Sequence, residues 1–311
     1  MNTRSQGLHH ITAIAGDPQR NLAFYAGTLG LRFVKRTVNF DDPGTYHFYF
    51  GDRIGHPGTL LTFFPWADAR PGRPGAGQAT LTSYAIPAGS AGYWENRLGR
   101  LGVSGVVRRE RFGETTLRLS DPDGLGLELV ERTAPRGEAW PGSAVPVAQQ
   151  ITGLAGTTLT LRGTEATADL LVEALGFAEG GSDGGVRRML SPDGSAVDLL
   201  RDPAGPSGTM GAGTVHHVAW RAADGADQLR LRGELLGRAL GVTPVVDRQY
   251  FQSIYFREPG GSLFEIATDG PGFLTDEVEA SLGAELRLPP QYEGNRAAIE
   301  AILPPLEVPA A

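Results

Sequence analysis

The spacing of apolar and polar side chains divides the chain into four similar units. Each unit begins with a strand-like alternation, continues into an amphipathic helix pattern and ends with further strand patterns, in the order β-α-β-β-β. Every helix pattern closes with a Leu-Gly pair, and a glycine just after a helix readily takes the left-handed conformation that ends it. The four pairs are Leu29-Gly30, Leu101-Gly102, Leu175-Gly176 and Leu240-Gly241. This repeat predicts an α+β protein of four βαβββ modules that form two curved-sheet, barrel-like halves.

The first unit shows the pattern most clearly. Asp17 can cap a helix that begins at Pro18, a residue whose fixed φ angle suits the first helical position. Leu22, Tyr25 and Leu29 then recur at helical spacing. We therefore expect one helix from Pro18 to Leu29, followed by the remaining strands of the unit.

A stretch rich in proline, glycine and alanine, at about residues 133–150, separates two pairs of units. We expect residues 1–140 to hold the first pair, residues 150–270 the second pair, and residues 271–311 a C-terminal tail. Within the tail, residues 293–303 show a helix pattern that two prolines close.

The last strand of three units carries a carboxylate at the same place. It lies six residues after the proline of the preceding turn, and the three residues are Glu128, Asp198 and Glu265. The comparable strand of the first unit offers Thr62 or Phe63 instead. Paired βαβββ units form a curved sheet whose first and last strands line a cavity, so these positions are candidates for a functional site.

Two histidine doublets occupy the opening strands of the first and last units. His9-His10 and His216-His217 account for four of the 6 histidines in the chain. Neighbouring side chains of a strand point to opposite faces, so one histidine of each doublet can face a shared site. We assign His10 and His217 as candidate metal ligands, which leaves His9 and His216 as groups behind the ligands or as packing residues. The opposite choice within each doublet stays open.

The pairing of the units decides which of these groups meet. Pairing the first unit with the last brings together His10, His217 and Glu265. Pairing the first with the second would give only His10 and Glu128. Pairing the third with the fourth would add Asp198 to the ligands of the fourth unit but leave the first doublet unexplained. We favour the first arrangement, because two imidazoles and one carboxylate form the facial set that suits non-haem Fe(II) and leaves coordination positions open.

Composition narrows the functional classes. The 311 residues are 41% hydrophobic and 20% charged, without an apolar run long enough to span a bilayer or an apolar core near the N-terminus. The net charge of -7 argues against nucleic acid as a partner. The count of 0 cysteines excludes disulfides, thiolate metal sites and cysteine nucleophiles. We therefore expect a cytoplasmic enzyme with neither a nucleic-acid nor a membrane partner.

Four segments carry a resemblance to a known family. Residues 8–12 (LHHIT), 32–37 (RFVKRT), 46–50 (YHFYF) and 288–293 (LPPQYE) resemble the hydroquinone and chlorohydroquinone 1,2-dioxygenases and bacterial proteins named putative ring-cleaving dioxygenases. These proteins belong to the vicinal oxygen chelate superfamily, which includes glyoxalases and extradiol dioxygenases. The resemblance covers nearly the whole chain.

The resemblance implies an Fe(II)-dependent, extradiol-type enzyme that cleaves a small hydroquinone-type aromatic substrate with O2. A purified sample could carry Mn, Zn or Ni in place of iron, and the chain could form a homo-oligomer. The family's metal ligands fall on His10, His217 and Glu265, and the groups around them fall on His9, Thr12, His216, Arg248 and Tyr255.

The resemblance also implies roles for the surrounding groups. His216 would transfer protons, and Thr12 would hydrogen-bond a ligand. Arg248 and Tyr255 would orient the substrate oxygens or stabilise developing charge. From the residues alone, Arg248 would instead be a surface ion pair and Tyr255 a packing residue.

Two other functions stay open at this point. One is a glyoxalase-like lyase or isomerase that uses Zn2+ or Ni2+, although such sites carry a second carboxylate that the first unit lacks. The other is a non-catalytic module of the same fold that binds an aromatic compound or a drug.

Overall fold

Four βαβββ units follow one another along the chain, as expected, in the computed structural model, which describes residues 5–134 and 136–308. The first unit comprises β1 (Leu8–Ala15), α1 (Pro18–Leu22), the π-helical turn η1 (Ala23–Thr28), β2 (Arg32–Asn39), β3 (Asp42–Gly51) and β4 (Leu60–Pro65). The second comprises β5 (Gln78–Pro87), α2 (Ala91–Arg100), β6 (Val107–Arg111), β7 (Glu114–Ser120) and β8 (Gly126–Arg132).

The other two units follow after the linker, which contains the short turn η2 (Val147–Gln149). The third unit comprises β9 (Gly153–Leu161), α3 (Glu165–Glu173), β10 (Ala178–Asp183), β11 (Val186–Leu190) and β12 (Ala196–Arg201). The fourth comprises β13 (Thr214–Ala222), α4 (Gly225–Gly237), β14 (Val246–Asp247), β15 (Gln252–Arg257) and β16 (Leu263–Thr268). The tail holds η3 (Phe273–Thr275), η4 (Glu279–Ser281), α5 (Pro290–Glu293) and α6 (Arg296–Ile302).

Some sequence expectations concern residues that the structure does not describe. Residues 1–4 belong to the N-terminus that is expected to lack an apolar core, and Pro135 belongs to the predicted linker. Both lie outside the described residues, as do residues 309–311. Within residues 5–134 and 136–308, the helices are all too short or too polar to cross a membrane.

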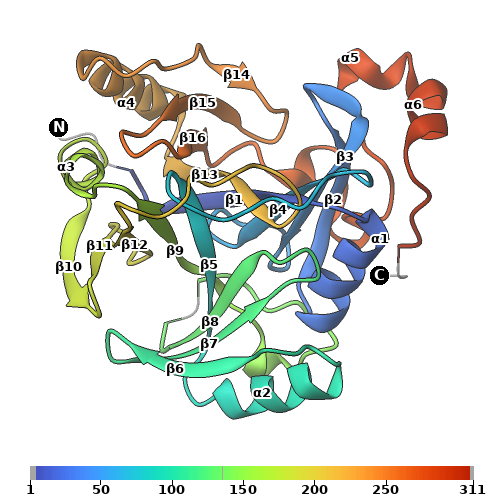
Figure 1. Ribbon diagram of the computed structural model, residues 1–311. Coiled ribbons are helices and arrows are strands. Elements are labelled where there is room, and N and C mark those ends of the chain that lie inside the picture. The colour runs from blue at the N-terminus through green and yellow to red at the C-terminus, as the bar shows by residue number, and fades with distance from the viewer. Residues whose placement is uncertain (1–4, 135, 309–311) are drawn as a thin grey trace.

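Two curved sheets of eight strands each form the framework (Figure 1). The strand order is β14-β15-β16-β13-β1-β4-β3-β2 in the first sheet and β10-β11-β12-β9-β5-β8-β7-β6 in the second. The first sheet therefore joins units one and four, and the second joins units two and three. Each sheet takes one unit from each side of the linker, and the pairing of the first unit with the last is confirmed.

The two sheets share one plan, which makes equivalent positions identifiable. In each sheet the opening strands of two units run antiparallel at the centre, β1 beside β13 and β5 beside β9, and each has the last strand of its own unit parallel on its other side. The four last-strand positions opposite Thr12, Ser83, Thr158 and Ala219 are Thr62, Glu128, Asp198 and Glu265. The register thus selects Thr62, not Phe63, as the counterpart of Glu265.

The register also identifies the residues of the second sheet that correspond to His10 and His217. His10 lies two residues before Thr12, and His217 lies two residues before Ala219. The same step from Ser83 and Thr158 leads to Leu81 and Gly156, so the counterparts of the two histidines in the second sheet have no metal-binding side chain. The bulges in these strand pairs shift the register by a residue, which an ungapped comparison of sequences does not detect.

Apolar side chains of the helices pack into a core shared by both sheets. Leu22, Trp94, Leu171 and Leu235, one from the helix of each unit, are at most 1% exposed. Strands β1 and β9 are buried along their whole length, because one face of each meets this core and the other faces the inside of its own curved sheet. Polar residues on the inner faces of these strands are therefore buried inside the curvature of each sheet.

The first helix differs in part from the expected one. The Asp17 side chain accepts a hydrogen bond from the Arg20 amide and confirms the predicted cap. The regular helix ends at Leu22, however, and a wider π-helical turn follows, in which the Leu29 amide donates to the Phe24 carbonyl at 2.9 Å. This wider turn places both Phe24 and Tyr25 in the core, which three regular turns at this spacing would not do as readily.

Three of the four predicted Leu-Gly helix ends are confirmed. Gly30, Gly102 and Gly176 have φ angles of 71°, 75° and 76°. The fourth prediction is wrong, because the left-handed residue after α4 is Ala239, with φ of 58°. There the Leu240 amide donates to the Leu235 carbonyl at 3.2 Å, so the helix is already closed before Gly241.

The tail lies against the first unit. The helix expected over residues 293–303 is present as α6, which is shorter at both ends, and the short α5 precedes it; Figure 1 shows both in red beside β3 and β2. The Tyr292 hydroxyl donates to the Phe40 carbonyl at 2.7 Å, and the Tyr46 hydroxyl donates to the Pro304 carbonyl at 2.9 Å. These contacts join the end of the chain to its beginning.

A buried lysine fixes the start of the tail. Lys35 of β2 has no exposed side-chain surface and forms ion pairs with Glu277 and, at 2.6 Å, with Asp276. Its ammonium group also lies 4.9 Å from the centre of the Tyr250 ring. Because Glu277 is equally buried, neither charge can be solvated by water, and each depends on the other.

We predict that Lys35→Met destabilises the fold by about 3 kcal/mol or more, because the buried Glu277 carboxylate would lose its nearest cation. Urea denaturation followed by tryptophan fluorescence measures this change in the free energy of unfolding. The double variant Lys35→Met/Glu277→Gln should recover part of the loss, since it removes the unpaired charge. Equal stability of Lys35→Met and the wild type would contradict this structural role.

Candidate metal centre

Three side chains that can bind a metal ion converge inside the first sheet. One ligand atom each from His10, His217 and Glu265 lies within 4.8 Å of the other two. The two histidine Nε2 atoms are 3.2 Å apart, and Glu265 Oε2 lies 2.9 Å from His217 Nε2 and 3.5 Å from His10 Nε2. All three side chains are buried. The structure thus brings together the groups that the pairing of units one and four predicts.

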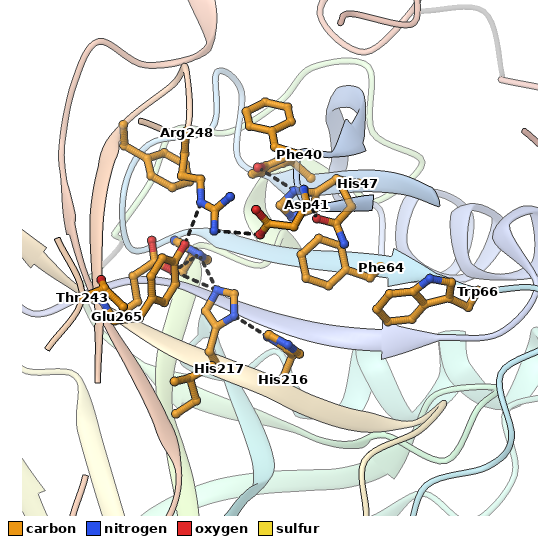
Figure 2. A pocket seen from close by; sticks show the side chains of 16 residues that line it. Phe40, Asp41, His47, Phe64, Trp66, His216, His217, Thr243, Arg248 and Glu265 are labelled. Carbon is orange, nitrogen blue, oxygen red and sulfur yellow. Dashed lines mark hydrogen bonds and ion pairs between the residues drawn. The ribbon is translucent and has the colours of Figure 1, made fainter. Parts of the chain in front are cut away.

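The strand register explains why these side chains meet. The antiparallel pairing of β1 with β13 places His10 opposite Ala219 and Thr12 opposite His217. Both imidazoles project from the same face of two neighbouring strands, and β16 adds Glu265 beside Ala219. Figure 2 shows His217 and Glu265 at the base of a cavity, with Arg248 above them.

The contacts of these three groups suit a metal ion. Glu265 Oε2 is buried and finds no hydrogen-bond partner within residues 5–134 and 136–308, although two imidazole nitrogens lie close to it. The other carboxylate oxygen accepts a hydrogen bond from Ser253, so the carboxylate is already oriented. A buried carboxylate oxygen without a partner costs free energy, and a divalent cation between the three lone-pair donors would remove that cost.

Hydrogen bonds behind His10 select the tautomer that a metal requires. His9 Nε2 lies 3.1 Å from the Thr268 carbonyl, which can only accept, so this nitrogen carries the proton. Burial lowers the pKa of His9 to about 3, so the ring is neutral and its Nδ1 is an acceptor. His10 Nδ1, at 2.8 Å, must then donate to it, which leaves the lone pair of His10 on Nε2, facing the site.

The second doublet repeats this arrangement. His216 Nδ1 lies 2.8 Å from His217 Nδ1, and burial lowers the pKa of His216 to about 3. A neutral His216 can therefore accept the Nδ1 proton of His217 and leave the Nε2 lone pair of that ring toward Glu265. Unlike His9, His216 also lines the cavity.

The charges of the cluster favour a cation. Burial lowers the pKa of His217, and this effect outweighs the opposite effect of Glu265. Burial alone would raise the pKa of Glu265, but the neighbouring His10 and His217 lower it well below its ordinary value. Neutral imidazole next to ionised carboxylate is the state in which all three groups offer lone pairs.

A cavity of about 360 Å³ opens above the three groups. Aromatic rings line one wall: the centre of the Phe64 ring lies 4.4 Å from that of His47, 5.7 Å from that of Trp66 and 5.5 Å from that of His216. Figure 2 shows Phe64, Trp66 and His47 on the same side of the cavity. A wall of this kind suits a flat aromatic ligand.

Arg248 and Tyr255 form the opposite side of the cavity. Arg248 Nε donates to the Tyr255 hydroxyl at 3.0 Å, and its Nη2 lies 3.0 Å from Asp41 of unit one. Burial and Glu265 raise the pKa of Tyr255, which therefore stays protonated. Arg248 thus forms the ion pair that its type alone suggests, but it does so at the cavity, next to a tyrosine and above His217.

Thr12 lies beside the cluster but has another hydrogen-bond partner. Its hydroxyl is 2.8 Å from that of Thr62, and Thr62 in turn lies 2.9 Å from His47 Nε2. The remaining nitrogen of His47 is 2.9 Å from the Tyr49 hydroxyl. The sequence predicted the position of Thr12 near the ligands, and the structure adds this connected row of polar groups.

Sequence reasoning missed several residues of the site. Besides the ring wall described above, they include His47, Tyr49 and Phe251, which line the cavity, and Ser253, which holds Glu265. A signal for the first two was available in residues 46–50, where His47 and Tyr49 occupy one strand face and three aromatic side chains occupy the other. Ser253 likewise lies two residues before Tyr255 on the same face of β15.

The second sheet has no histidine at the equivalent place and holds arginine there. Arg111 lies 3.1 Å from Glu128 and 2.7 Å from Asp198, and Arg188 lies 2.8 Å from the other oxygen of Asp198. Arg188 also lies above the Phe112 ring, 3.8 Å from its centre. Glu128 and Asp198 are therefore salt-bridged repeat positions, and guanidinium groups neutralise both.

This fold is that of a large protein class. The family model described as the Glyoxalase/Bleomycin resistance protein/Dioxygenase superfamily matches residues 7–129. The chain belongs to this superfamily, since relatives named as dioxygenases align with it along almost its whole length.

Three of these similar proteins are informative. The "putative ring-cleaving dioxygenase MhqO" of Bacillus subtilis is 50% identical over 310 residues, which cover 99% of both chains. The chlorohydroquinone/hydroquinone 1,2-dioxygenase of Sphingobium indicum is 38% identical over 303 residues, which cover 94% of both. A crystal structure of a "putative dioxygenase" from Bacillus subtilis, 50% identical, superposes with a TM-score of 0.96 and covers 99% of this chain and 100% of its own.

Proposed function

We propose that this protein is an extradiol-type, Fe(II)-dependent ring-cleaving dioxygenase that acts on hydroquinone-type aromatic compounds with O2. The observation that carries the proposal is the convergence of His10, His217 and Glu265 at the base of a cavity with an aromatic wall. The similarity to the chlorohydroquinone/hydroquinone 1,2-dioxygenase over most of the chain supports the same reaction class.

His10, His217 and Glu265 would hold the metal ion. Bound by such a facial set, Fe(II) lowers the pKa of a phenolic hydroxyl and leaves positions open for O2. The Thr268 carbonyl, through His9, keeps the lone pair of His10 directed at this point. His216 does the same for His217.

The cavity would bind the substrate ring and its oxygens. The ring packs against Phe64 and the other aromatic side chains of the wall. Arg248 supplies a positive charge and Tyr255 a hydrogen-bond donor for an oxygen that has lost its proton. His216 lines the cavity, and we assign to it the transfer of the proton that this hydroxyl releases.

The overall reaction would need no external reductant. One ring C–C bond next to a hydroxyl-bearing carbon breaks, and both atoms of O2 enter the ring-opened product. The electrons that reduce O2 therefore come from the ring itself.

The glyoxalase-like alternative lacks a second carboxylate. The position equivalent to Glu265 in the first unit is Thr62, whose hydroxyl is hydrogen-bonded to Thr12 and His47. A lyase or isomerase with two carboxylate ligands is therefore less well supported than a dioxygenase with three protein ligands. The non-catalytic module is distinguished from the enzyme by the absence of turnover.

The ligand set is tested by metal content. After anaerobic loading with Fe(II) and desalting, we expect iron in the wild type and its loss in His10→Ala and Glu265→Ala, because each variant removes one of three ligands. Glu128→Ala should retain iron, because Glu128 is the equivalent carboxylate in the arginine-filled sheet. Loss of iron in Glu128→Ala, with retention in Glu265→Ala, would show that the metal site lies in the second sheet and that this assignment is wrong. Iron is measured by mass spectrometry of the digested protein.

The orientation of Glu265 is tested through Ser253. Ser253→Ala should weaken Fe(II) binding by about 10- to 100-fold, because it removes the hydrogen bond that orients the carboxylate. The control is Ser83→Ala, which removes a serine hydrogen bond to the carboxylate of Glu128 in the second sheet, at 2.9 Å. Competition with a fluorescent chelator gives both affinities, and equal affinities in the two variants would argue against the role of Ser253.

Turnover is tested with an oxygen electrode. The Fe(II)-loaded wild type should consume O2 and hydroquinone in equal amounts, and mass spectrometry should find a product heavier than hydroquinone by both atoms of labelled O2. Conversion of hydroquinone without uptake of O2 would support a lyase or isomerase. Tight binding of hydroquinone without any conversion would support the binding module.

A further inference from the structure

Two tyrosines occupy equivalent positions on opposite sides of the cavity. In unit four, Tyr255 of β15 lies opposite Glu265 of β16, and in unit one, Tyr49 of β3 lies opposite Thr62 of β4. Because Thr62 is the counterpart of Glu265, Tyr49 is the counterpart of Tyr255. Both line the cavity, so its two sides offer one phenol group each.

The group beside each tyrosine gives the two sides different charges. Tyr255 accepts a hydrogen bond from the permanently charged Arg248, so its own proton is free to be donated into the cavity. That combination of a cation and a free donor matches an ionised oxygen.

Tyr49 is paired with a neutral group instead. Its hydroxyl lies 2.9 Å from His47 Nδ1, and His47 Nε2 lies 2.9 Å from the Thr62 hydroxyl. Burial lowers the pKa of His47 well below its ordinary value, and burial raises that of Tyr49. When Tyr49 donates to His47, its oxygen can accept a hydrogen bond from a ligand hydroxyl, and when His47 donates to Tyr49, the Tyr49 hydroxyl is free to donate a hydrogen bond to the ligand. Either direction fits a neutral hydroxyl group.

Packing holds this second pair in place. The centre of the His47 ring lies 4.1 Å from that of Tyr49 and 4.4 Å from that of Phe64, so the imidazole lies between two rings. Tyr49 is 2% exposed, and the centre of its ring lies 5.0 Å from that of Phe273. A hydrogen-bonding group that cannot move away is one that can discriminate between ligands.

We propose that Tyr49, oriented by His47, hydrogen-bonds the neutral hydroxyl of the aromatic substrate, while Arg248 and Tyr255 hold its ionised oxygen. The cavity then selects a diol that has lost a single proton. Tyr49 contacts the substrate, and His47 is a positioning residue that acts through Tyr49. This inference rests on the proposed function, because it assumes that the ligand is a phenol with a second hydroxyl group.

The test compares two ligands that differ only in that hydroxyl. Hydroquinone and 4-methylphenol are titrated into the Fe(II)-loaded protein without O2, and isothermal titration calorimetry gives both dissociation constants. Tyr49→Phe should weaken hydroquinone binding by about fivefold, the effect of one neutral hydrogen bond, and change 4-methylphenol binding by less than about twofold. His47→Phe keeps the ring stack and should give the same selective loss, without a further loss in the double variant.

Two controls distinguish hydrogen bonding from packing. Tyr46→Phe removes a hydroxyl from the same strand that donates to Pro304 outside the cavity, and should leave both affinities unchanged. Tyr255→Phe should weaken both ligands to a similar extent, because each carries the oxygen that faces Arg248.

The experiment distinguishes failure of this inference from failure of the proposed function. Equal weakening of both ligands by Tyr49→Phe, or no weakening of either, would overturn the role of Tyr49 and leave the proposed function intact. Wild-type protein that binds neither phenol would overturn the proposed function, and the inference with it.

Discussion

The antiparallel pairing of β1 with β13 is the contact on which the rest of the structure depends. It joins the first and last units of the chain and sets the register that places His10 and His217 on one face of neighbouring strands. On its other side β13 pairs with β16, so Glu265 reaches the same point. A slip of one residue would turn every side chain of a strand to the opposite face, so the cluster depends on this register. The tail packs against the same sheet, where Lys35 of β2 forms ion pairs with Asp276 and Glu277.

The two sheets meet one electrostatic constraint in different ways. A buried carboxylate needs a compensating charge, and the shared strand plan places such carboxylates in both sheets. In the second sheet, Arg111 lies between Glu128 and Asp198, so the charges are neutralised within the protein. In the first sheet, Glu265 is left with a free oxygen and Thr62 replaces its partner carboxylate. Of these two groups of buried carboxylates, the one in the first sheet has an oxygen that a bound cation would satisfy.

Much of this arrangement could be predicted because the repeat is visible in the sequence. The histidine doublets and the carboxylates of the last strands are visible in the sequence. Because only one pairing of units brings His10, His217 and Glu265 together, these residues predicted which units pair. Local hydrogen bonding was harder to predict: α4 ends at Ala239 because the Leu240 amide reaches back to Leu235, which no glycine signals. His47 was missed for another reason, since its strand shows a normal alternation and its neighbours become known only when β3 and β4 are aligned.

The repeat also explains how one cavity can have two unlike sides. Gene-level repetition would supply the same strand position twice, and Tyr49 and Tyr255 still occupy it. The difference arises one layer further out, where Tyr255 meets the charged Arg248 and Tyr49 meets the neutral His47. A phenol beside a cation favours an anionic partner, and a phenol beside a neutral imidazole favours a neutral one. Changing the neighbours while keeping the tyrosines is thus sufficient to give a symmetric frame two cavity sides of different charge.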